Sequence, residues 1–325
     1  MEAPAQTAPP RIAVVVVTYN GSPWIDRCLQ SIASQAIPTL TIVVDNASTD
    51  DTCARIQAGG HDVTLIPSAK NLGFGVGNNL GIRRALDAGA EFIFLLNQDA
   101  YLCEGCLPEL VAFMEKTPAV GIAAPLHCSP DPEHVDRRTF RGYLQCHAED
   151  YLCDAVFNRT QPSYSVHGVN AAGWCVRASV FQTFGGFDPL FFMYGEDDDL
   201  LARWAFHRVR FELLPGARMV HLRQSPPGAK AGYGRRLWLG SERRRSELLK
   251  TIKHPGYSLL HMLAVLLAKG FIVPLADALV LRRWTELLAA QLGAVRVALQ
   301  IKQVLAHARL TARRGEHFLQ ETTTP

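Results

Sequence analysis

The chain has 325 residues, of which 48% are hydrophobic and 19% are charged. This composition is typical of a globular protein and excludes an intrinsically disordered chain. The length suffices for one large α/β domain with an appendage. The formal net charge is only +3, so no nucleic acid partner is expected.

The eight cysteines are scattered through apolar segments, and the stretch that precedes them lacks the apolar core of a secretion signal. We therefore expect free thiols in a reducing cytoplasm and not a disulfide framework. Cys103 and Cys106 form a single C-x-x-C pair. Without a second pair or a nearby histidine, this pair is too small a ligand set to predict a zinc site.

The first third of the chain alternates between apolar runs and helical segments. Residues 1–10 are rich in Pro and Ala and predict a disordered tail. Short runs of β-branched residues are typical of strands buried on both faces. Their alternation with helices predicts a parallel, doubly wound α/β sheet. Strands are expected at residues 11–17, 40–44, 63–66 and 91–96, and helices are expected to open at Ser22-Pro23 and Asp50, with a third ending near Ala88.

The pattern changes after residue 125. Residues 126–165 are irregular and polar, which predicts an inserted loop or hairpin region. Strands at 169–176, 209–214 and 218–222 and helices at 177–184 and 197–207 follow. Pro226-Pro227-Gly228 marks a boundary. We predict a tail over 1–10, an α/β domain over 11–228 and a helical region over 229–325.

Polar clusters follow four of the expected strands. In an open parallel sheet, ligands bind at the carboxyl ends of the strands. Asx, Ser and Thr side chains also close turns, so one such cluster would be ordinary turn chemistry. Four clusters in succession favour a binding site. They are Thr18-Tyr19-Asn20, Asp45 to Asp50, Asn71 to Gly75, and Asn97-Gln98-Asp99.

Asp45 and the following glycine-rich stretch suggest a nucleotide. Asp45 follows four apolar residues, so its carboxylate lies at a buried strand end and needs a donor. The imide N–H of uracil or thymine would serve, and backbone N–H groups of a turn are the alternative. Gly73 to Gly77 would let backbone amides approach a diphosphate. The stretch is not a dinucleotide-binding fingerprint, because Asn78 stands where the third Gly is required.

Three further features indicate catalysis. Asp99 ends an apolar strand and offers an oxygen ligand to Mg²⁺, which would act as a Lewis acid on a leaving diphosphate. The first turn of a helix favours one or two acids, but the four from Glu196 to Asp199 repel one another without a cation or a partner. One of them is a candidate general base for a hydroxyl nucleophile. His221 is either a structural histidine or a further site residue, since it lies at a strand end.

Five motifs, in order, resemble the inverting family-2 glycosyltransferases of the GT-A fold, and especially their rhamnosyltransferase-like members. Each motif is modest alone, but the five in order are specific and cover about residues 11–225. The resemblance implies a metal-dependent hexosyltransferase of cell-surface polysaccharide synthesis. It would move a sugar such as rhamnose from a dTDP- or UDP-sugar to a hydroxyl of a glycan or lipid-linked acceptor. The motifs are VVVTYNG (15–21), VDNASTDDT (44–52), NLGFGVGNN (71–79), LLNQDA (95–100) and GGFDPLFFMYGEDDDL (185–200).

The resemblance also implies residue roles for the donor and the metal. The metal, Mg²⁺ or Mn²⁺, would be bound by Asp99 and His221. Asn97 stands where the family's Asp-x-Asp motif begins, which leaves the metal fewer carboxylates. The nucleobase and ribose would be lined by Thr18, Tyr19, Asn20 and Asp45, and the rest of the donor by Asn71, Gly73, Phe74 and Gly75.

For catalysis, the resemblance implies Asp197 as the general base, with Glu196 beside it. Asp198 departs from the apolar residue that relatives carry, and this makes the choice of base less certain. The acceptor oxygen would attack the anomeric carbon from the face opposite the nucleotide, so the configuration would invert.

The C-terminal region suggests a membrane surface or a packed subdomain. Seven basic residues against two acidic ones lie between Arg235 and Lys253. Residues 255–268 carry no charged side chain other than His, but Lys269, Pro274 and Asp277 interrupt the segment before the roughly 20 residues of a spanning helix. An amphipathic helix follows. The region either packs on the α/β domain or docks peripherally on the anionic inner face of the cell membrane.

Two other functions fit parts of the chain. A processive polysaccharide synthase typically carries Gln-x-x-Arg-Trp, but here Leu200 replaces the Gln before Arg203-Trp204. A catalytically silent nucleotide- or glycan-binding module would not need Asp99 and the acidic run. The resemblance therefore favours an enzyme.

Overall fold

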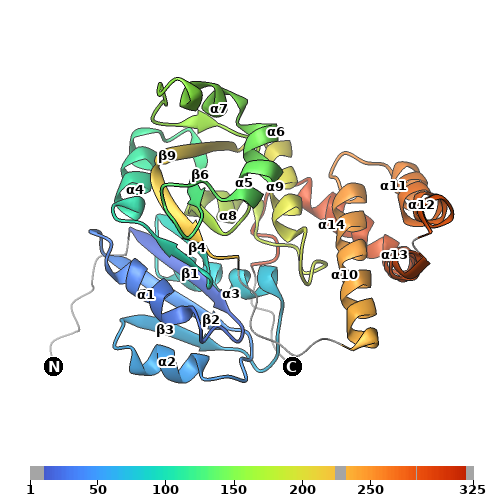
Figure 1. Ribbon diagram of the computed structural model, residues 1–325, viewed down its shortest axis with the longest axis horizontal. Coiled ribbons are helices and arrows are strands. Elements are labelled where there is room, and N and C mark those ends of the chain that lie inside the picture. The colour runs from blue at the N-terminus through green and yellow to red at the C-terminus, as the bar shows by residue number, and fades with distance from the viewer. Residues whose placement is uncertain (1–10, 224–231, 283, 320–325) are drawn as a thin grey trace. The chain divides into compact units, whose positions relative to one another are not determined.

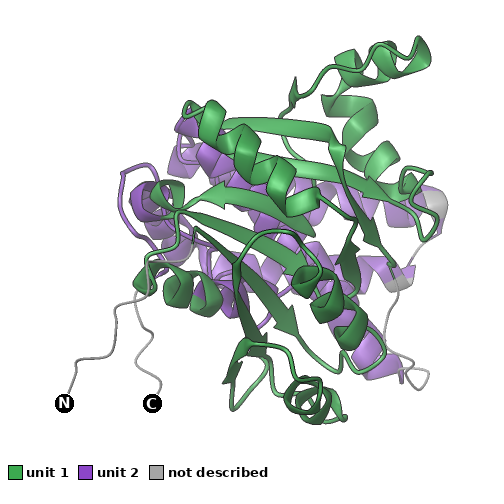
Figure 2. Cartoon of the chain, turned by 90° about the vertical axis from the view of Figure 1, so that its left-hand side faces the viewer, with its two compact units in different colours: residues 1–71, 80–181, 209–224 green, residues 72–79, 182–208, 225–325 purple. Residues whose placement is uncertain are grey.

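The computed structural model describes residues 11–223, 232–282 and 284–319. The chain divides into two compact units, which Figure 2 shows in green and purple. Unit 1 comprises residues 1–71, 80–181 and 209–224, and unit 2 comprises 72–79, 182–208 and 225–325. The expected tail and Pro226-Pro227-Gly228 lie outside the described residues. The predicted domain boundary near residue 228 stays a prediction.

Unit 1 is built on a nine-stranded sheet of order β3-β2-β1-β4-β8-β6-β9-β5, with β7 paired to β9 (Figure 1). The predicted doubly wound, mostly parallel sheet is confirmed. The strands that run in one direction are β1 (Ile12–Thr18), β2 (Thr39–Asp45), β3 (Val63–Pro67), β4 (Phe92–Asn97), β6 (Val120–Cys128) and β9 (Arg210–His221). Those that run against them are β5 (Ala100–Leu102), β7 (Tyr164–Ser165) and β8 (Gly173–Arg177).

The core of unit 1 explains why the apolar runs form central strands. Every residue of β1 is buried, and β1 pairs with β2 on one side and β4 on the other. Side chains of one face, including Val14 and Phe94, pack against three helices. These are α1 (Ile25–Ala33), α2 (Thr52–Ala58) and α4 (Cys106–Lys116). On α3 (Phe74–Asp87), a Cβ at Gly81 would overlap the Val15 side chain, so glycine permits this close approach.

The helix starts differ slightly from expectation. Neither Ser22 nor Pro23 opens α1, whose N-cap is Trp24 without a side-chain cap. The N-cap of α2 is Asp51 and not Asp50, although Asp50 accepts hydrogen bonds from the backbone and side chain of Thr52, the first residue of α2. Helix α8 (Ala178–Phe184) agrees with the prediction. The two strands expected at 209–214 and 218–222 form one strand, β9, whose pairing with β6 shifts register between Leu214 and Arg218.

The predicted loop region over 126–165 is wrong for most of its length. Strand β6 continues to Cys128, and a nearly continuous helical stretch follows. Its buried residues Thr139, Leu144, Ala148 and Tyr151 are three to five positions apart, so they lie on one side of the helices. The polar residues between them concealed this period. The stretch consists of α5 (Arg137–Thr139), the π-helix η1 (Phe140–Leu144), α6 (Gln145–His147) and α7 (Glu149–Val156).

Unit 2 is helical, as expected of the C-terminal region, and has its own core. Leu190, Leu249, Ile252, Met262 and Val297 are among its buried residues. Its helices are α9 (Glu196–Phe206), α10 (Tyr233–Ile252), α11 (Leu259–Val265), the π-helix η2 (Leu266–Ile272), α12 (Val273–Leu281), α13 (Trp284–Leu299) and α14 (Ile301–Thr311).

The apolar segment of unit 2 is not interrupted, and this prediction is wrong. Within the described residues, Leu259–Val280 is one helix of 22 residues, long and apolar enough to cross a membrane by length and composition alone. Only 17% of its most apolar window is buried. Pro274 is tolerated because the wider π-turns of η2 precede it, and Lys269 lies within those turns.

Candidate active site

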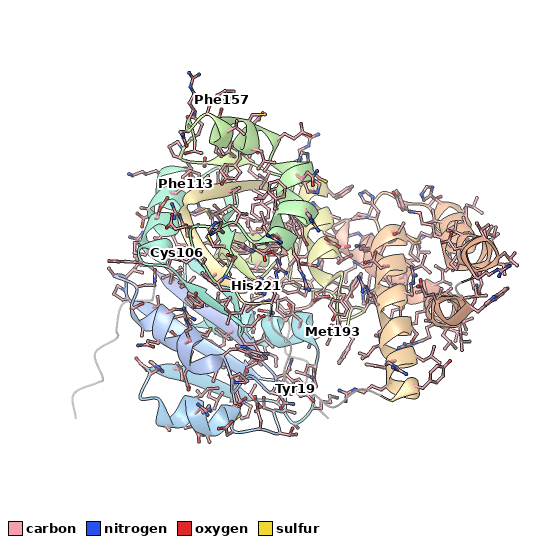
Figure 3. The ribbon with its side chains drawn as sticks, viewed as in Figure 1. Tyr19, Cys106, Phe113, Phe157, Met193 and His221 are labelled. Carbon is pink, nitrogen blue, oxygen red and sulfur yellow. The ribbon has the colours of Figure 1, made fainter. Side chains whose placement is uncertain are left out.

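The carboxyl ends of four strands bring the predicted nucleotide and metal residues to one edge of the unit 1 sheet. Thr18 pairs in register with Asp45, and Asn97 lies opposite Val17. His221 ends β9, which runs in the same direction. Figure 3 shows Tyr19 near the surface and His221 within the fold. The parallel register therefore confirms the expected convergence of these strand ends.

Asp45 has one committed and one available oxygen. Its carboxylate is only 3% exposed. Oδ2 accepts a hydrogen bond of 3.0 Å from the Ser48 backbone N–H, as in an Asx-turn. Oδ1 is buried without a hydrogen-bond partner of ordinary geometry among the described residues. The Cys53 thiol is a weak donor to the Asp45 carboxylate, and burial, the Asp45 charge and this hydrogen bond raise the pKa of Cys53. The turn role of Asp45 is confirmed for Oδ2, and its contact with a nucleobase through Oδ1 stays a prediction.

Gln98, which sequence reasoning did not assign, joins the first and fourth strand ends. Its Oε1 accepts hydrogen bonds from Thr18 Oγ1 at 2.6 Å and from the Tyr19 backbone N–H at 2.9 Å. Asn20 adopts a positive φ of 48°, and its Oδ1 accepts a 2.8 Å bond from the Thr49 backbone N–H. These bonds fix the first loop against its neighbours before any ligand binds.

Asp99 and His221 form a compact corner. Asp99 Oδ1 lies 3.3 Å from His221 Nε2, and the Asn97 amide nitrogen lies 3.5 Å from the same ring nitrogen. The pairing of β5 with β9 sets this geometry, because Ala100 is in register with His221 and the Leu222 N–H donates to Asp99 O at 2.9 Å. Asn97 Oδ1 and His221 Nδ1 are buried without hydrogen-bond partners among the described residues.

This corner fits a divalent cation with few protein ligands. Two neighbouring ligands of an octahedral Mg²⁺ site lie about 3 Å apart, close to the separation of Asp99 and His221. No group of three His, Cys, Asp or Glu suited to a metal occurs in the described part of the chain. The orphaned oxygen of Asn97 is the third candidate ligand, and an octahedral site leaves room for diphosphate oxygens and water.

A buried network that the sequence did not reveal supports His221. The ring of His127 lies edge-on to that of His221, with 6.3 Å between centroids. Burial first, then the charges of His221 and Arg223, lower the pKa of His127 to about 3, so it is neutral. With its amide oriented to satisfy both neighbours, Asn170 donates to His127 Nδ1 at 2.9 Å and accepts from Arg223.

The glycine-rich loop is divided between the units. Asn71 lies half-buried at its start in unit 1, whereas Gly73, Phe74 and Gly75 belong to unit 2. Gly73 has a φ of +82°, and a Cβ there would overlap the Phe192 carbonyl. A Cβ at Gly75 would lie 2.8 Å from Phe187 Cβ. Close packing within unit 2 therefore requires both glycines, independently of any diphosphate.

The acidic run opens α9 in unit 2, and its four carboxylates occupy different environments. Asp198 forms a salt bridge of 2.8 Å with Lys250, so its charge is paired although the side chain is partly exposed. Asp199 is buried and bonds Arg203 at 2.9 Å and Lys253 at 2.6 Å. Half of the run is thus neutralised by cations from later in the chain, which resolves the repulsion noted in the sequence.

Glu196 and Asp197 are adjacent in the sequence but differ in burial. Glu196 is 7% exposed, and burial, followed by the Asp197 charge, raises its pKa to about 8. At neutral pH it is mostly protonated and cannot readily accept a proton. Asp197 is half-buried, and its Oδ1 accepts a 2.9 Å hydrogen bond from the Asp198 N–H. The raised pKa of Glu196 argues against Glu196 as the base, and the role of Asp197 stays a prediction.

Asp188 completes a buried ionic cluster around α9 that sequence reasoning missed. Its carboxylate binds Lys253 at 3.0 Å and His307 at 2.8 Å. Burial alone would raise the pKa of Asp188, but Lys253 and His307 outweigh it and hold this pKa well below its usual range. Arg203 also donates to Gly186 O at 2.6 Å, so the acidic helix is tied to the preceding loop.

Residues 13–182, more than half of the chain, match the model of the family described as Glycosyl transferase family 2. The chain belongs to this glycosyltransferase family. It is therefore a glycosyltransferase, as predicted, and the family-2 resemblance is confirmed.

The enzyme is similar to rhamnosyltransferases of this family. It is 28% identical over 231 residues to the N-acetylglucosaminyl-diphospho-decaprenol L-rhamnosyltransferase of Mycobacterium tuberculosis, a match of 65% of this chain and 75% of that protein. It is 26% identical over 212 residues to the dTDP-rhamnosyl transferase RfbF of Shigella flexneri, a match of 65% of this chain and 68% of that protein.

The solved structure of a mannosyltransferase from Pyrobaculum calidifontis, in complex with GDP-Man and Mn²⁺, has the same fold. The TM-score is 0.54 at 21% identity, and the match covers 92% of this chain and 90% of the mannosyltransferase chain. The predicted GT-A fold with C-terminal helices is confirmed.

Proposed function

We propose that this glycosyltransferase moves a sugar from a dTDP- or UDP-sugar to a hydroxyl of a glycan or lipid-linked acceptor, and that the sugar is rhamnose. The reaction inverts the anomeric configuration and serves cell-surface polysaccharide synthesis. The observation that carries the proposal is the shared edge at which Asp45 offers a buried acceptor and Asp99 meets His221. The rhamnosyltransferase names of two relatives support the choice of sugar.

Asp45 selects the base in this proposal. A buried acceptor without a strong hydrogen bond is destabilising, and Asp45 Oδ1 is such an acceptor. In this proposal the imide N–H of thymine or uracil donates to it. Cytosine presents an acceptor at the same ring position and leaves Oδ1 unsatisfied. The bonded loop of Thr18, Tyr19 and Asn20 forms the rest of the base and ribose pocket.

We assign a divalent metal, Mg²⁺ or Mn²⁺, to Asp99 and His221, with the unpaired amide oxygen of Asn97 as a third candidate ligand. Such a cation, when bound, neutralises negative charge on the leaving diphosphate. The neutral His127 packs edge-on against the His221 ring, and Asn170 in turn hydrogen-bonds His127. Asn71, Gly73, Phe74 and Gly75 lie along the remainder of the donor in this proposal.

Asp197 acts as the general base. It takes the proton of the acceptor hydroxyl as that oxygen bonds to the anomeric carbon, and the bond from this carbon to the diphosphate breaks on the opposite face. Glu196, which is mostly protonated at neutral pH, supplies a hydrogen-bond donor beside the base. The salt bridges of Asp198 and Asp199 keep these two acids from competing for the proton.

The test of this function is a panel of nucleotide sugars with identification of the product. We expect transfer from a dTDP- or UDP-sugar, little from a CDP-sugar, and an inverted anomeric centre by NMR. A single added sugar supports the proposal, whereas a ladder of products indicates a processive synthase. Nucleotide binding with neither transfer nor donor hydrolysis indicates a non-catalytic module and overturns the proposal.

Attachment to the inner face of the cell membrane is a further part of this proposal. The basic cluster expected to face lipid does not form one surface, because Arg245 and Lys253 are buried and Arg244 and Lys250 are ion-paired. The exposed apolar side chains of Leu259–Val280 are a better contact. Leu260, Leu267, Leu279 and Val280 are each more than half exposed.

The mode of attachment is tested by extraction from membranes. Apolar contact predicts that Leu267→Glu/Leu279→Glu releases the protein, whereas high salt does not. A second variant, in which the exposed Arg235, Arg236 and Arg243 are replaced by Glu, tests electrostatic attachment. If only that variant releases the protein, attachment is electrostatic, and if wild type ignores membranes at low salt, there is none.

A further inference from the structure

Three arginines on the helical stretch after β6 have no counter-charge. Arg137, Arg138 and Arg141 are exposed, and no salt bridge among the described residues involves them. Arg141 is four positions after Arg137 and three after Arg138, so its charge lies beside both on the helix surface, where like charges repel. The acid nearest in sequence, Asp136, is already committed to Arg223 and to the Thr139 N–H. We call these three residues the arginine patch.

The fold holds the arginine patch at the carboxyl edge of the unit 1 sheet. After β6, the chain turns back so that Val135 bridges Cys128 and the Asp136 N–H donates to His127 O at 2.9 Å. Arg223, two residues beyond His221, donates to Asp136 at 3.0 Å and to Thr139 Oγ1 at 2.9 Å. The helix is thereby anchored to the strand that carries His221.

The backbone conformation and contacts of Arg223 indicate a positioning role. It adopts a φ of +57°, a strained conformation for a side chain of this size. Its side chain is 21% exposed, and its guanidinium is held by Asp136, Thr139 and Asn170. Its contacts run through Asn170 to the neutral His127 behind His221. The arginine patch and the candidate metal corner are therefore parts of one connected structure.

The order of the strands separates the arginine patch from the nucleobase end of the donor. Asp45 lies on β2, and β6, which leads to the patch, is four places away, roughly 19 Å at the usual strand spacing. His221 ends β9, the neighbour of β6, so the patch lies on the side of the metal corner that is far from Asp45.

We propose that the arginine patch binds the diphosphate of a lipid-linked acceptor, an inference that rests on the proposed function. Guanidinium groups bind phosphate oxygens in bidentate pairs. The mycobacterial relative is named for an acceptor with a diphospho-decaprenol group. Phe140, 39% exposed between Arg138 and Arg141, offers an apolar contact to the first units of the lipid.

The test compares Arg137→Gln/Arg138→Gln/Arg141→Gln with a control of equal charge change. Arg84→Gln/Lys116→Gln/Arg159→Gln removes three exposed cations of unit 1 that form no salt bridge among the described residues. Farnesyl diphosphate is the binding probe, with farnesol and vesicles of anionic phospholipid alongside. Thermal unfolding confirms that both variants fold, since all six side chains are exposed.

We expect wild type and the control to bind farnesyl diphosphate alike and the patch variant to bind it roughly tenfold or more weakly. Affinity for the nucleoside diphosphate should be equal in all three. Equal farnesyl diphosphate affinity in all three overturns the proposal. A loss of nucleotide affinity assigns the patch to the donor, and a loss confined to vesicle binding assigns it to the membrane surface; both overturn it.

A transfer assay separates this inference from the proposed function. With the same sugar acceptor on a diphosphate lipid and on a neutral aglycone, the patch variant should raise KM only for the former. If wild type transfers to both and the patch variant matches it, the inference fails and the function stands. If wild type transfers to neither but farnesyl diphosphate binding needs the arginines, the function fails and the anion site stands.

Discussion

The Lys253 ammonium lies 2.6 Å from Asp199 Oδ1, and both side chains are fully buried. Lys253 immediately follows α10, whereas Asp199 is in the first turn of α9. Lys253 also bonds Asp188 at 3.0 Å, so one cation holds two buried carboxylates. The end of α10 is thus part of the structure that orients the acidic run.

Lys253→Met should be strongly destabilising. It leaves Asp188 and Asp199 buried with less compensation, and breaking such a buried pair costs about 3–5 kcal/mol. Lys250→Met is the matched control, because the half-exposed pair of Lys250 with Asp198 contributes about 1 kcal/mol or less. Denaturant unfolding measures both. An equal decrease in the free energy of unfolding for the two variants would show that the buried pairs contribute no more to stability than the exposed pair.

Glu196→Gln should change the pH dependence of stability. The folded state holds a proton on Glu196 up to about pH 8, because burial raises its pKa, whereas the unfolded chain releases it near the ordinary value of 4.5. Wild type therefore loses stability as pH rises through this window, by at most about 1.4 kcal/mol per pH unit. Glutamine resembles the protonated acid and removes this contribution.

The measurement is the free energy of unfolding of wild type and Glu196→Gln between pH 5 and pH 9. The difference between the two should move in favour of the variant as pH rises. Other groups titrate in both proteins and cancel in the difference. Parallel curves would mean that Glu196 is ionised at neutral pH in the folded protein.

Asp197→Asn should abolish the chemical step while donor binding is kept. Asparagine is nearly isosteric with aspartate but cannot take a proton, and loss of a general base costs about 10²–10⁴-fold in kcat. Glu196→Gln should cost less. Asp198→Val should be tolerated, because its ion pair with Lys250 is partly exposed.

The kcat and donor affinity of these three variants decide the base. Near-normal kcat in Asp197→Asn together with an inactive Glu196→Gln would make Glu196 the base. Loss of donor affinity with kcat intact in Asp197→Asn would instead make Asp197 a donor-positioning residue.

Asp99→Asn should weaken both metal binding and activity. The substitution removes the one carboxylate at the corner with His221 and leaves only neutral ligands. Mn²⁺ binding followed by electron paramagnetic resonance provides a readout independent of turnover. Asp62→Asn makes the same change at an exposed carboxylate just before β3, at the opposite end of the strand from the site, and is the control. Undiminished turnover in EDTA would exclude the metal.

The sequence alone was sufficient for the sheet edge. Buried parallel strands are continuous apolar runs, and the polar residue that ends each run is visible locally, as at Thr18, Asp45 and Asn97. Because parallel strands end at the same edge, the order of apolar runs and polar ends was enough to place these positions together. His221 follows from the same pattern, since it ends the last apolar run of the sheet.

The partners of the acidic run could not be read from the sequence. Lys253 is 54 residues from Asp199, and nothing in the local pattern marks it as buried. Only the packing of unit 2 pairs Asp198 and Asp199 with cations and buries Glu196, and this divides four similar acids into different roles.

The helical stretch at 137–156 and the continuous apolar helix at 259–280 likewise depend on tertiary contacts. Thr139 and Asp136 are buried because Arg223 and His127 lie against them, not because they are apolar. Pro274 continues a helix because the π-turns before it accommodate its missing N–H. Sequence patterns report hydrophobicity and local backbone preference, whereas polar burial depends on partners distant in the chain, which only the folded structure brings into contact.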